Sequence, residues 1–161
     1  MRKIITVTLN TAIDHVLEVP SFRSGKMYRS KSAQIFPAGK GINVTRTLIA
    51  LGKKVVALGF VGRASLNLFN TLDSALCSVQ LTVVDGETRR NISIVDPEQN
   101  TLTHIINPGY EVSNTDLENS RLLLKTILKL TTSSSFREVY LMESRHLSIK
   151  NLFTFAMIRM P

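Results

Sequence analysis

The feature that most constrains the fold is an alternation of strand-like and helix-like segments over the first 130 residues. Apolar runs typical of strands are followed by segments whose apolar residues recur at helical spacing. We expect strands at 4–9, 55–61 and 79–84, and helices at 41–51, 66–76 and 113 to about 130. Strands that alternate with helices form a parallel sheet covered by helices, so the sequence predicts an α/β fold.

Four further short segments have strand character and do not fit this alternation. They lie at 16–19, 28–36, 90–95 and 102–106, and turn residues separate them. One pair precedes the first helix, and the other pair precedes the last helix. These strands therefore lie outside the alternating part of the predicted fold.

A glycine-rich turn lies where an extended segment gives way to the helix at 41–51. Gly39 and Gly41 flank Lys40, and Asn43 falls in the first helical turn. Glycines let the backbone approach a ligand closely, and a helix start offers unpaired N–H groups to polar or anionic ligands. Upstream, the carboxylate of Asp14 accepts hydrogen bonds and suits sugar hydroxyls. These residues indicate a sugar or sugar-phosphate pocket, with a surface acid, a tight turn and a solvated lysine as the alternative interpretations.

The turn is neither of two common phosphate-binding motifs. Lys40 is followed by glycine instead of the Ser or Thr of a P-loop. Val44 occupies the place of the third glycine in a dinucleotide-binding fingerprint. The pocket is therefore expected to bind its ligand in another way.

Four segments, taken in order, carry a resemblance to a known family. They are Asn10-Thr11-Ala12-Ile13-Asp14, residues 39–44, Gly86-Glu87-Thr88-Arg89 with Asn91, and Asn107-Pro108-Gly109. Together they resemble the amino-terminal half of the ribokinase-like carbohydrate kinases, in the 1-phosphofructokinase and tagatose-6-phosphate kinase branch. Thr11 replaces that family's proline, and Ala38 replaces a glycine. The resemblance implies a ribokinase-like parallel sheet with covering helices and a small β-sheet lid, formed by residues of about 15–36 and 89–106.

The resemblance also implies a function and a set of binding residues. The family phosphorylates a ketose monophosphate with ATP and Mg²⁺. The resemblance assigns substrate binding in this chain to Asp14, Gly39, Lys40, Gly41, Asn43 and Arg89, with Lys26, Arg29 and Asn91 as weaker candidates. Arg89 and Arg90 are adjacent on a strand and point to opposite faces, and the family match selects Arg89. The planar guanidinium of Arg89 suits a substrate phosphate.

The catalytic part of the family pattern does not occur in this sequence. The family's catalytic aspartate lies in a Gly-x-Gly-Asp motif, which is found nowhere in the 161 residues. We therefore expect no catalytic residue and no ATP site here, and a truncated kinase that is inactive alone. A loop at 62–66 also lacks the glycines that the family has there.

The chain changes character after a Thr- and Ser-rich run at 131–135. The glycine-rich turn that the family would place after the next strand is absent, although residues 139–142 favour an added strand. We expect two parts: residues 1–130, the amino-terminal part of a sugar-kinase domain with its lid strands, and residues 131–161, a divergent tail. An out-of-frame reading would produce such a tail.

Two other functions stay open on the sequence alone. A lid fragment without activity could form a homodimer or pair with an intact kinase through its β-lid. The formal charge of +8 suggests nucleic-acid binding, but 13 Lys and Arg face 10 Asp and Glu in residues 1–120. The remaining 41 residues carry a net charge of +5 without a dense basic run, so nucleic-acid binding is the weakest alternative.

Several residue types argue against other classes of protein. Cys77 is the only cysteine, which excludes an internal disulfide and fits a reducing cytoplasm. His15, His104 and His146 lack metal-ligand spacing, so no metal site is expected. The apolar runs are shorter than a membrane span, and no export signal is indicated.

Overall fold

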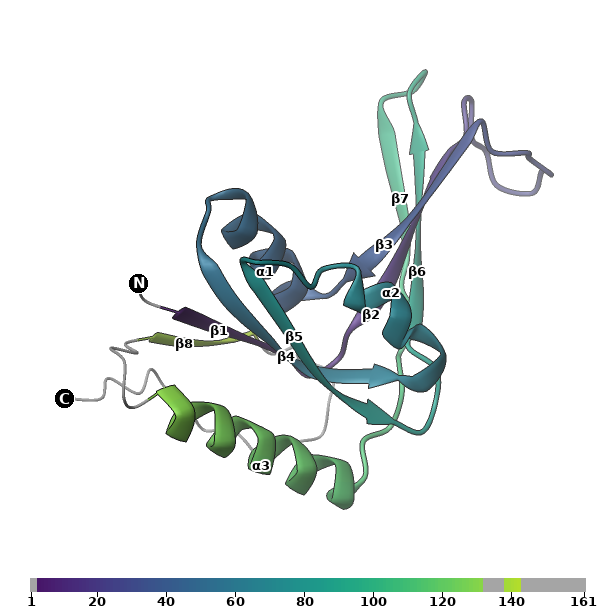
Figure 1. The fold of residues 1–161 in the computed structure, drawn as a ribbon. Coiled ribbons are helices and arrows are strands. Elements are labelled where there is room, and N and C mark those ends of the chain that lie inside the picture. The colour runs from purple at the N-terminus through teal and green to yellow at the C-terminus, as the bar shows by residue number, and fades with distance from the viewer. Residues whose placement is uncertain (1–2, 132–137, 143–161) are drawn as a thin grey trace.

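The computed structural model describes residues 3–131 and 138–142, which form two sheets and their connecting helices (Figure 1). The larger sheet has the strand order β5-β4-β1-β8, and all its strand pairs are parallel. Its strands are β1 (Lys3–Thr8), β4 (Lys54–Gly62), β5 (Cys77–Val84) and β8 (Glu138–Met142). The predicted α/β fold with a parallel sheet is confirmed.

Helices cover both faces of this sheet (Figure 1). They are α1 (Lys40–Ala50), α2 (Leu66–Asn70), which follows a 3₁₀ turn at Arg63–Ser65, and α3 (Asn114–Thr131). One face packs against α1 and α2 through buried Ile13, Ile42, Ala57, Val61, Phe69 and Cys77. The other packs against α3 through buried Ile5, Val7, Leu9, Val56, Leu58, Phe60, Val84, Tyr110 and Leu117. Alternate residues of β4 enter the two cores, as the period of two in a strand requires.

The second sheet has the order β3-β2-β6-β7 and projects away from the first (Figure 1). Its strands are β2 (Ala12–Glu18), β3 (Ser32–Ala38), β6 (Arg89–Asp96) and β7 (Thr101–Ile105). β2 is antiparallel to β3 and parallel to β6, and β6 is antiparallel to β7. We call this sheet the lid. It arises from the carboxyl end of the parallel sheet, because β2 begins four residues after β1 ends.

Three elements differ from their predicted bounds by more than two residues. The helix expected at 66–76 ends at Asn70, because the side chains of Asp73 and Ser74 accept backbone N–H bonds from the start of β5 and turn the chain. The strand expected at 16–19 begins at Ala12, which places Asp14 inside a strand. The strand expected at 28–36 runs over Ser32–Ala38 instead.

The start of α3 follows the sequence prediction. The backbone N–H of Asp116 donates to Ser113 Oγ at 3.1 Å, and the N–H of Ser113 donates to Asp116 Oδ2 at 3.0 Å. This reciprocal pair satisfies two groups that a helix start leaves open. The strand expected at 139–142 is present as β8, while the rest of the predicted tail, 132–137 and 143–161, lies outside the described residues.

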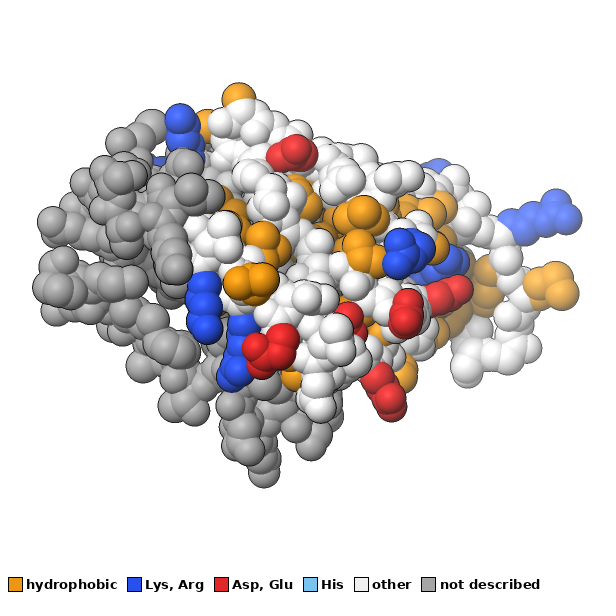
Figure 2. Space-filling view, turned by 60° about the horizontal axis from the view of Figure 1, so that its bottom comes forward, with side chains coloured by type: hydrophobic (Ala, Val, Ile, Leu, Met, Phe, Trp, Pro, Cys, Tyr) orange, Lys and Arg blue, Asp and Glu red, His pale blue; other side chains and the backbone are white. Residues whose placement is uncertain are grey.

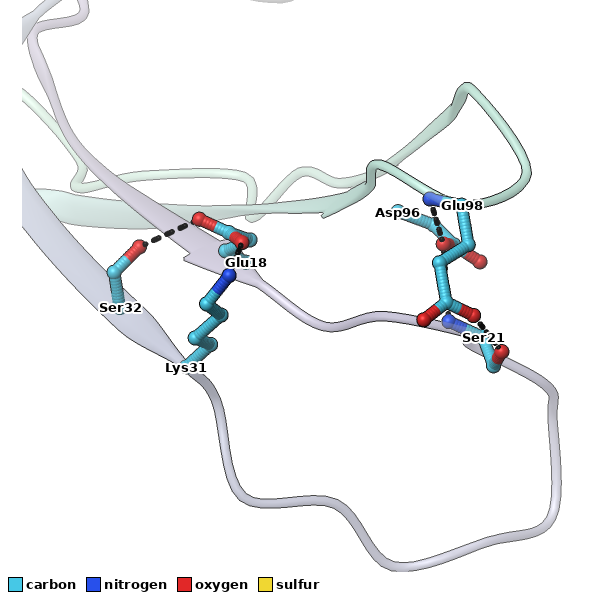
Figure 3. A network of polar contacts seen from close by, with 6 residues as sticks. All are labelled: Glu18, Ser21, Lys31, Ser32, Asp96 and Glu98. Carbon is cyan, nitrogen blue, oxygen red and sulfur yellow. Dashed lines mark hydrogen bonds and ion pairs between the residues drawn. The ribbon is translucent and has the colours of Figure 1, made fainter.

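Asp96 connects two loops at the far end of the lid (Figure 3). Its side chain is 1% exposed, and its oxygens accept the backbone N–H groups of Ser21, Phe22, Glu98 and Gln99 at 2.8–3.2 Å. Burial alone would raise the pKa of Asp96, but the four N–H donors favour the charged form, and the pKa lies below its ordinary value. The Asp96 carboxylate therefore fixes the loop between β2 and β3.

A second ionic contact closes the same loop. Lys31 Nζ lies 3.3 Å from Glu18 Oε1, and Ser32 Oγ donates to Glu18 Oε2 at 3.3 Å (Figure 3). The Lys31 side chain is 71% exposed and that of Glu18 31%, so we expect the ion pair to contribute little to stability.

We predict that Asp96→Asn lowers the thermal unfolding midpoint at about pH 7, because a neutral amide cannot replace a carboxylate that accepts four N–H bonds. The folded-state pKa is below the ordinary value of 3.8, so this stabilisation is present above that pH and is lost as the pH falls through the folded-state pKa. In thermal melts between about pH 7 and pH 3, the difference between the two midpoints should therefore shrink as the pH falls below 3.8. Asp85→Asn, in an exposed turn, is the matched control. Parallel melting curves at every pH would contradict the prediction.

Candidate functional site

The first turn of α1 packs directly against the end of β1. Gly39 has φ +118°, a conformation that favours glycine, and a Cβ there would lie 2.8 Å from Thr8 Cγ2. A Cβ on Gly41 would collide with Thr8 Oγ1 and lie 2.8 Å from the carbonyl oxygen of Val7. Both glycines therefore permit close backbone packing at the carboxyl end of the sheet, where open α/β folds bind ligands.

The hydroxyls on β1 hold this helix in place. Thr6 Oγ1 and Thr45 Oγ1 are 2.6 Å apart, and Thr45 Oγ1 also donates to the carbonyl of Gly41 at 3.0 Å. Thr8 Oγ1 is buried and has no hydrogen-bond partner among the described residues. The helix start also lacks a side-chain cap and an acidic residue in its first turn. The first N–H groups of α1 are thus left without side-chain partners.

Asp14 and Asn91 form a pair on one face of the lid. They are direct neighbours in the parallel register of β2 and β6, and Asn91 Nδ2 donates to Asp14 Oδ1 at 2.9 Å. Asn91 Oδ1 is buried without a hydrogen-bond partner in the described part of the chain. The bond orients the carboxylate of Asp14 and leaves acceptor capacity for a ligand hydroxyl.

Arg89 lies on the same lid face, two residues before Asn91. Its position is set by Thr88, whose buried Oγ1 accepts the backbone N–H of Gly62 at 2.9 Å. Arg89 Nη2 donates to the backbone carbonyl of Asn10 at 3.2 Å, whereas its Nε is buried and unpaired within the described residues. Arg90, on the opposite face, is exposed. A half-buried guanidinium with an unpaired N–H is suited to an anion.

Tyr110 lies beneath this arrangement and is 7% exposed. Its hydroxyl is 2.8 Å from the carbonyl oxygen of Phe60 and accepts the backbone N–H of Thr11 at 3.1 Å. Burial raises the pKa of Tyr110, although the bonds to Thr11 and the charge of Arg89 act in the opposite direction. The phenol is therefore neutral at physiological pH and can donate to Phe60 while accepting from Thr11.

Asn43 and Lys40 are both exposed on α1, in its first turn. Asn43 borders a groove of about 490 Å³ lined by Phe36, Asn43, Arg46, Thr47 and Ala50. Phe36 on β3 is the register partner of Asp14 on β2. The groove therefore lies next to the Asp14–Asn91 pair. The Arg46 guanidinium stacks over the Phe36 ring at 4.8 Å.

The weaker candidates lie apart from this group. Lys26 and Arg29 are exposed on the loop between β2 and β3, which follows the end of β2 farthest from the parallel sheet. The structure thus brings together Asp14, Asn91 and Arg89 on the lid with Gly39, Gly41 and Asn43 nearby, and it leaves these two basic residues at the far end.

No metal site is formed by the described residues. Within 3–131 and 138–142, no group of three or more His, Cys, Asp or Glu side chains could hold a metal ion. His104 Nδ1 lies 3.0 Å from Ser93 Oγ, and Cys77 is buried, which raises its pKa to about 11. The described residues therefore contain no ligand group that fits the Mg²⁺ implied by the family resemblance. None of the helices in these ranges is long and apolar enough to cross a membrane.

Sequence reasoning missed two of the residues that shape the site. The carbonyl of Asn10 accepts from Arg89, and Tyr110 contacts Thr11 across 99 positions of the chain. Asn10 and the segment 107–109 both belong to the matching motifs, which is the signal that could have indicated their contact. The structure shows it directly: Asn10 Nδ2 donates to the carbonyl of Pro108 at 3.0 Å.

A parallel sheet with a β-lid over its carboxyl end, and polar residues between the two, defines the class of ribokinase-like carbohydrate kinases. A ribokinase structure from Thermotoga maritima matches with a TM-score of 0.56 and 26% identity, over 68% of this chain and 37% of that one. A second structure from the same organism, of a possible 1-phosphofructokinase, matches with a TM-score of 0.75 and 33% identity, over 89% of this chain and 45% of that one.

The pattern that defines pfkB family carbohydrate kinases matches residues 1–158. The chain belongs to the pfkB family of carbohydrate kinases. It is 33% identical over 127 residues to the 1-phosphofructokinase of Rhodobacter capsulatus, which covers 78% of this chain and 40% of that protein. The chain thus spans about 40% of the length of this relative.

We predict that Gly41→Ala destabilises the protein by about 1–3 kcal/mol, because the added methyl group meets the Thr8 hydroxyl and the rigid Val7 backbone. The free energy of unfolding from urea titration measures the effect. Thr47→Ala, at an exposed position of the same helix, is the control and should change it by less than about 0.5 kcal/mol. A Gly41→Ala protein as stable as the parent would show that the helix start does not pack so closely against β1.

Proposed function

We propose that this chain supplies the sugar-monophosphate-binding part of a pfkB-family kinase. The observation that carries this proposal is the convergence of the Asp14–Asn91 pair and Arg89 on one face of the lid, beside the start of α1. A carboxylate, an amide and a guanidinium with unpaired polar atoms provide the acceptors and donors that a phosphorylated sugar needs.

Each residue has a distinct role in this proposal. Asp14 accepts hydrogen bonds from sugar hydroxyls, and Asn91 orients its carboxylate. Arg89 pairs with the phosphate that the substrate already carries. Gly39 and Gly41 let the substrate approach the N–H groups of α1, with Lys40 and Asn43 at its border.

The named relatives suggest the substrate class and reaction. A 1-phosphofructokinase acts on fructose 1-phosphate, so a ketose monophosphate is the proposed ligand. ATP with Mg²⁺ would supply the phosphoryl group in such a reaction. Phosphoryl transfer depends on charge stabilisation around the transferred group, and the described residues contain no group of three or more His, Cys, Asp or Glu that could hold the metal. We therefore propose that these 161 residues hold the sugar phosphate and do not phosphorylate it.

The opposite face of the lid supports a second candidate function. Ile35 and Ile105 are 55% and 48% exposed, and they lie on the face away from Asp14. An exposed apolar face on a small sheet favours pairing with a second copy or with an intact kinase. Nucleic-acid binding gains no such support. Figure 2 shows basic and acidic side chains interspersed over the described part of the face containing α3.

The proposed division of the chain follows the same reasoning. Residues 1–130 hold every candidate binding residue, the lid and the first three strands of the parallel sheet. Residues 131–161 are proposed to be a divergent tail, of which β8 adds one strand beside β1.

We predict that Arg89→Ala weakens binding of fructose 1-phosphate about tenfold or more, because it removes a charged partner of the phosphate. Arg90→Ala is the matched control, since the neighbouring arginine is exposed on the other lid face, and its affinity should equal the parent's. Isothermal titration calorimetry with fructose 1-phosphate and with unphosphorylated fructose separates the contribution of the phosphate to the affinity from that of the sugar. Equal affinities of the Arg89→Ala and Arg90→Ala proteins would place the phosphate elsewhere.

We predict background activity only when the chain is incubated with Mg²⁺, ATP and a ketose monophosphate. Coupled assays should test fructose 1-phosphate, fructose 6-phosphate and tagatose 6-phosphate with protein free of host kinases. The Arg89→Ala protein, purified in the same way, reports any contaminating activity. Turnover that this substitution abolishes would show that the chain is itself a kinase.

A further inference from the structure

The peptide unit between Asn10 and Thr11 is held from both sides. A trans peptide is planar, and its C=O and N–H point in opposite directions. The C=O of Asn10 accepts from Arg89 Nη2 at 3.2 Å, and the N–H of Thr11 donates to the Tyr110 hydroxyl at 3.1 Å. Arg89 and Tyr110 therefore contact opposite edges of one rigid plane.

The anchor on the Tyr110 side is itself rigid. The hydroxyl donates to the carbonyl of Phe60 on β4 at 2.8 Å, and the Thr11 hydroxyl donates to the same carbonyl at 2.7 Å. Thr11 and Phe60 are both fully buried, at 0% exposure. The orientation of the peptide unit is thus fixed by hydrogen bonds to β4, in the centre of the parallel sheet.

The Arg89 side is the one left open to a ligand. Among the described residues, the Arg89 guanidinium donates to the carbonyl of Asn10, and its Nε is buried without a partner. A rotation of the peptide unit would move the Asn10 oxygen and remove the hydrogen bond that orients the guanidinium. A freely rotating arginine loses more side-chain entropy when it binds a phosphate than one that is already held.

We propose that Tyr110 is a positioning residue for phosphate binding: its hydroxyl fixes the Asn10–Thr11 peptide unit, whose carbonyl aims the Arg89 guanidinium at the phosphate monoester of the substrate. This inference rests on the proposed function of Arg89. It assigns to Tyr110 an effect on ligand affinity that acts through Arg89 and requires no contact with the ligand.

The test compares two tyrosine hydroxyls that each accept a backbone N–H and donate to a backbone carbonyl. Tyr28 is the matched control, because its hydroxyl also accepts a backbone N–H, from Arg23 at 2.8 Å, and donates to a backbone carbonyl, of Ser21 at 3.1 Å. In calorimetric titrations with fructose 1-phosphate, Tyr110→Phe should raise the dissociation constant about twofold to tenfold, as expected for one side chain that must be ordered on binding. Tyr28→Phe should leave it unchanged.

A double-mutant cycle separates positioning from general stability. In the Arg89→Ala background, adding Tyr110→Phe should produce no further change in affinity, because the residue through which it acts is gone. An effect of Tyr110→Phe that persists in full in this background would overturn the proposal. Equal dissociation constants of the parent and Tyr110→Phe proteins would also overturn it.

A measurement without ligand keeps the two proposals distinguishable. The Arg89 Nε–H signal in ¹H–¹⁵N spectra, assigned by its loss in Arg89→Ala, should shift or broaden in Tyr110→Phe and stay in place in Tyr28→Phe. If the parent binds no sugar phosphate but this signal responds, the proposed function fails and the positioning by Tyr110 holds. An unchanged Arg89 signal in a folded Tyr110→Phe protein would refute the positioning role whether or not the ligand binds.

Discussion

Close backbone packing around the end of β1 is the constraint on which the rest of the structure depends. Gly41 brings α1 against Val7 and Thr8, and Gly59 of β4 has no room for a side chain beside the carbonyl of Thr8. Because these contacts leave no freedom at the end of β1, the chain leaves the parallel sheet in a defined direction. The lid strand β2 begins there, and Asp14 is its third residue.

The lid combines segments that are far apart in the chain into one polar face. β2 and β6 pair in parallel, so Asp14 meets Asn91, and Arg89 lies beside the turn that leads into β2. Buried polar atoms are usually paired, yet Thr8 Oγ1, Asn91 Oδ1 and Arg89 Nε have no partner among the described residues. Asn91 and Arg89 lie on the same face of the lid, and Thr8 lies against the start of α1, which gives a physical reason for a ligand at this place.

Membership of the pfkB family agrees with this geometry. The match to a relative covers only part of the length of that relative. The chain corresponds to about 40% of a curated 1-phosphofructokinase. Within that span, the chain has the Asp14 carboxylate and the Arg89 guanidinium, which we propose bind sugar hydroxyls and a phosphate. Stabilising a γ-phosphate in transfer requires further charged groups. Substrate binding and phosphoryl transfer can therefore be tested separately in this protein.

Local patterns in the sequence determined the α/β class, the starts of α1 and α3, and the opposite faces of Arg89 and Arg90. These follow from apolar periodicity, capping chemistry and strand alternation, which act over a few residues. The end of α2 was misjudged because Asp73 and Ser74 bind the backbone of β5, a tertiary effect. Only the tertiary structure decided that one peptide unit, Asn10–Thr11, lies between Arg89 and Tyr110. Those contacts join residues 79 and 99 positions apart, and no local pattern encodes the orientation of a single peptide plane.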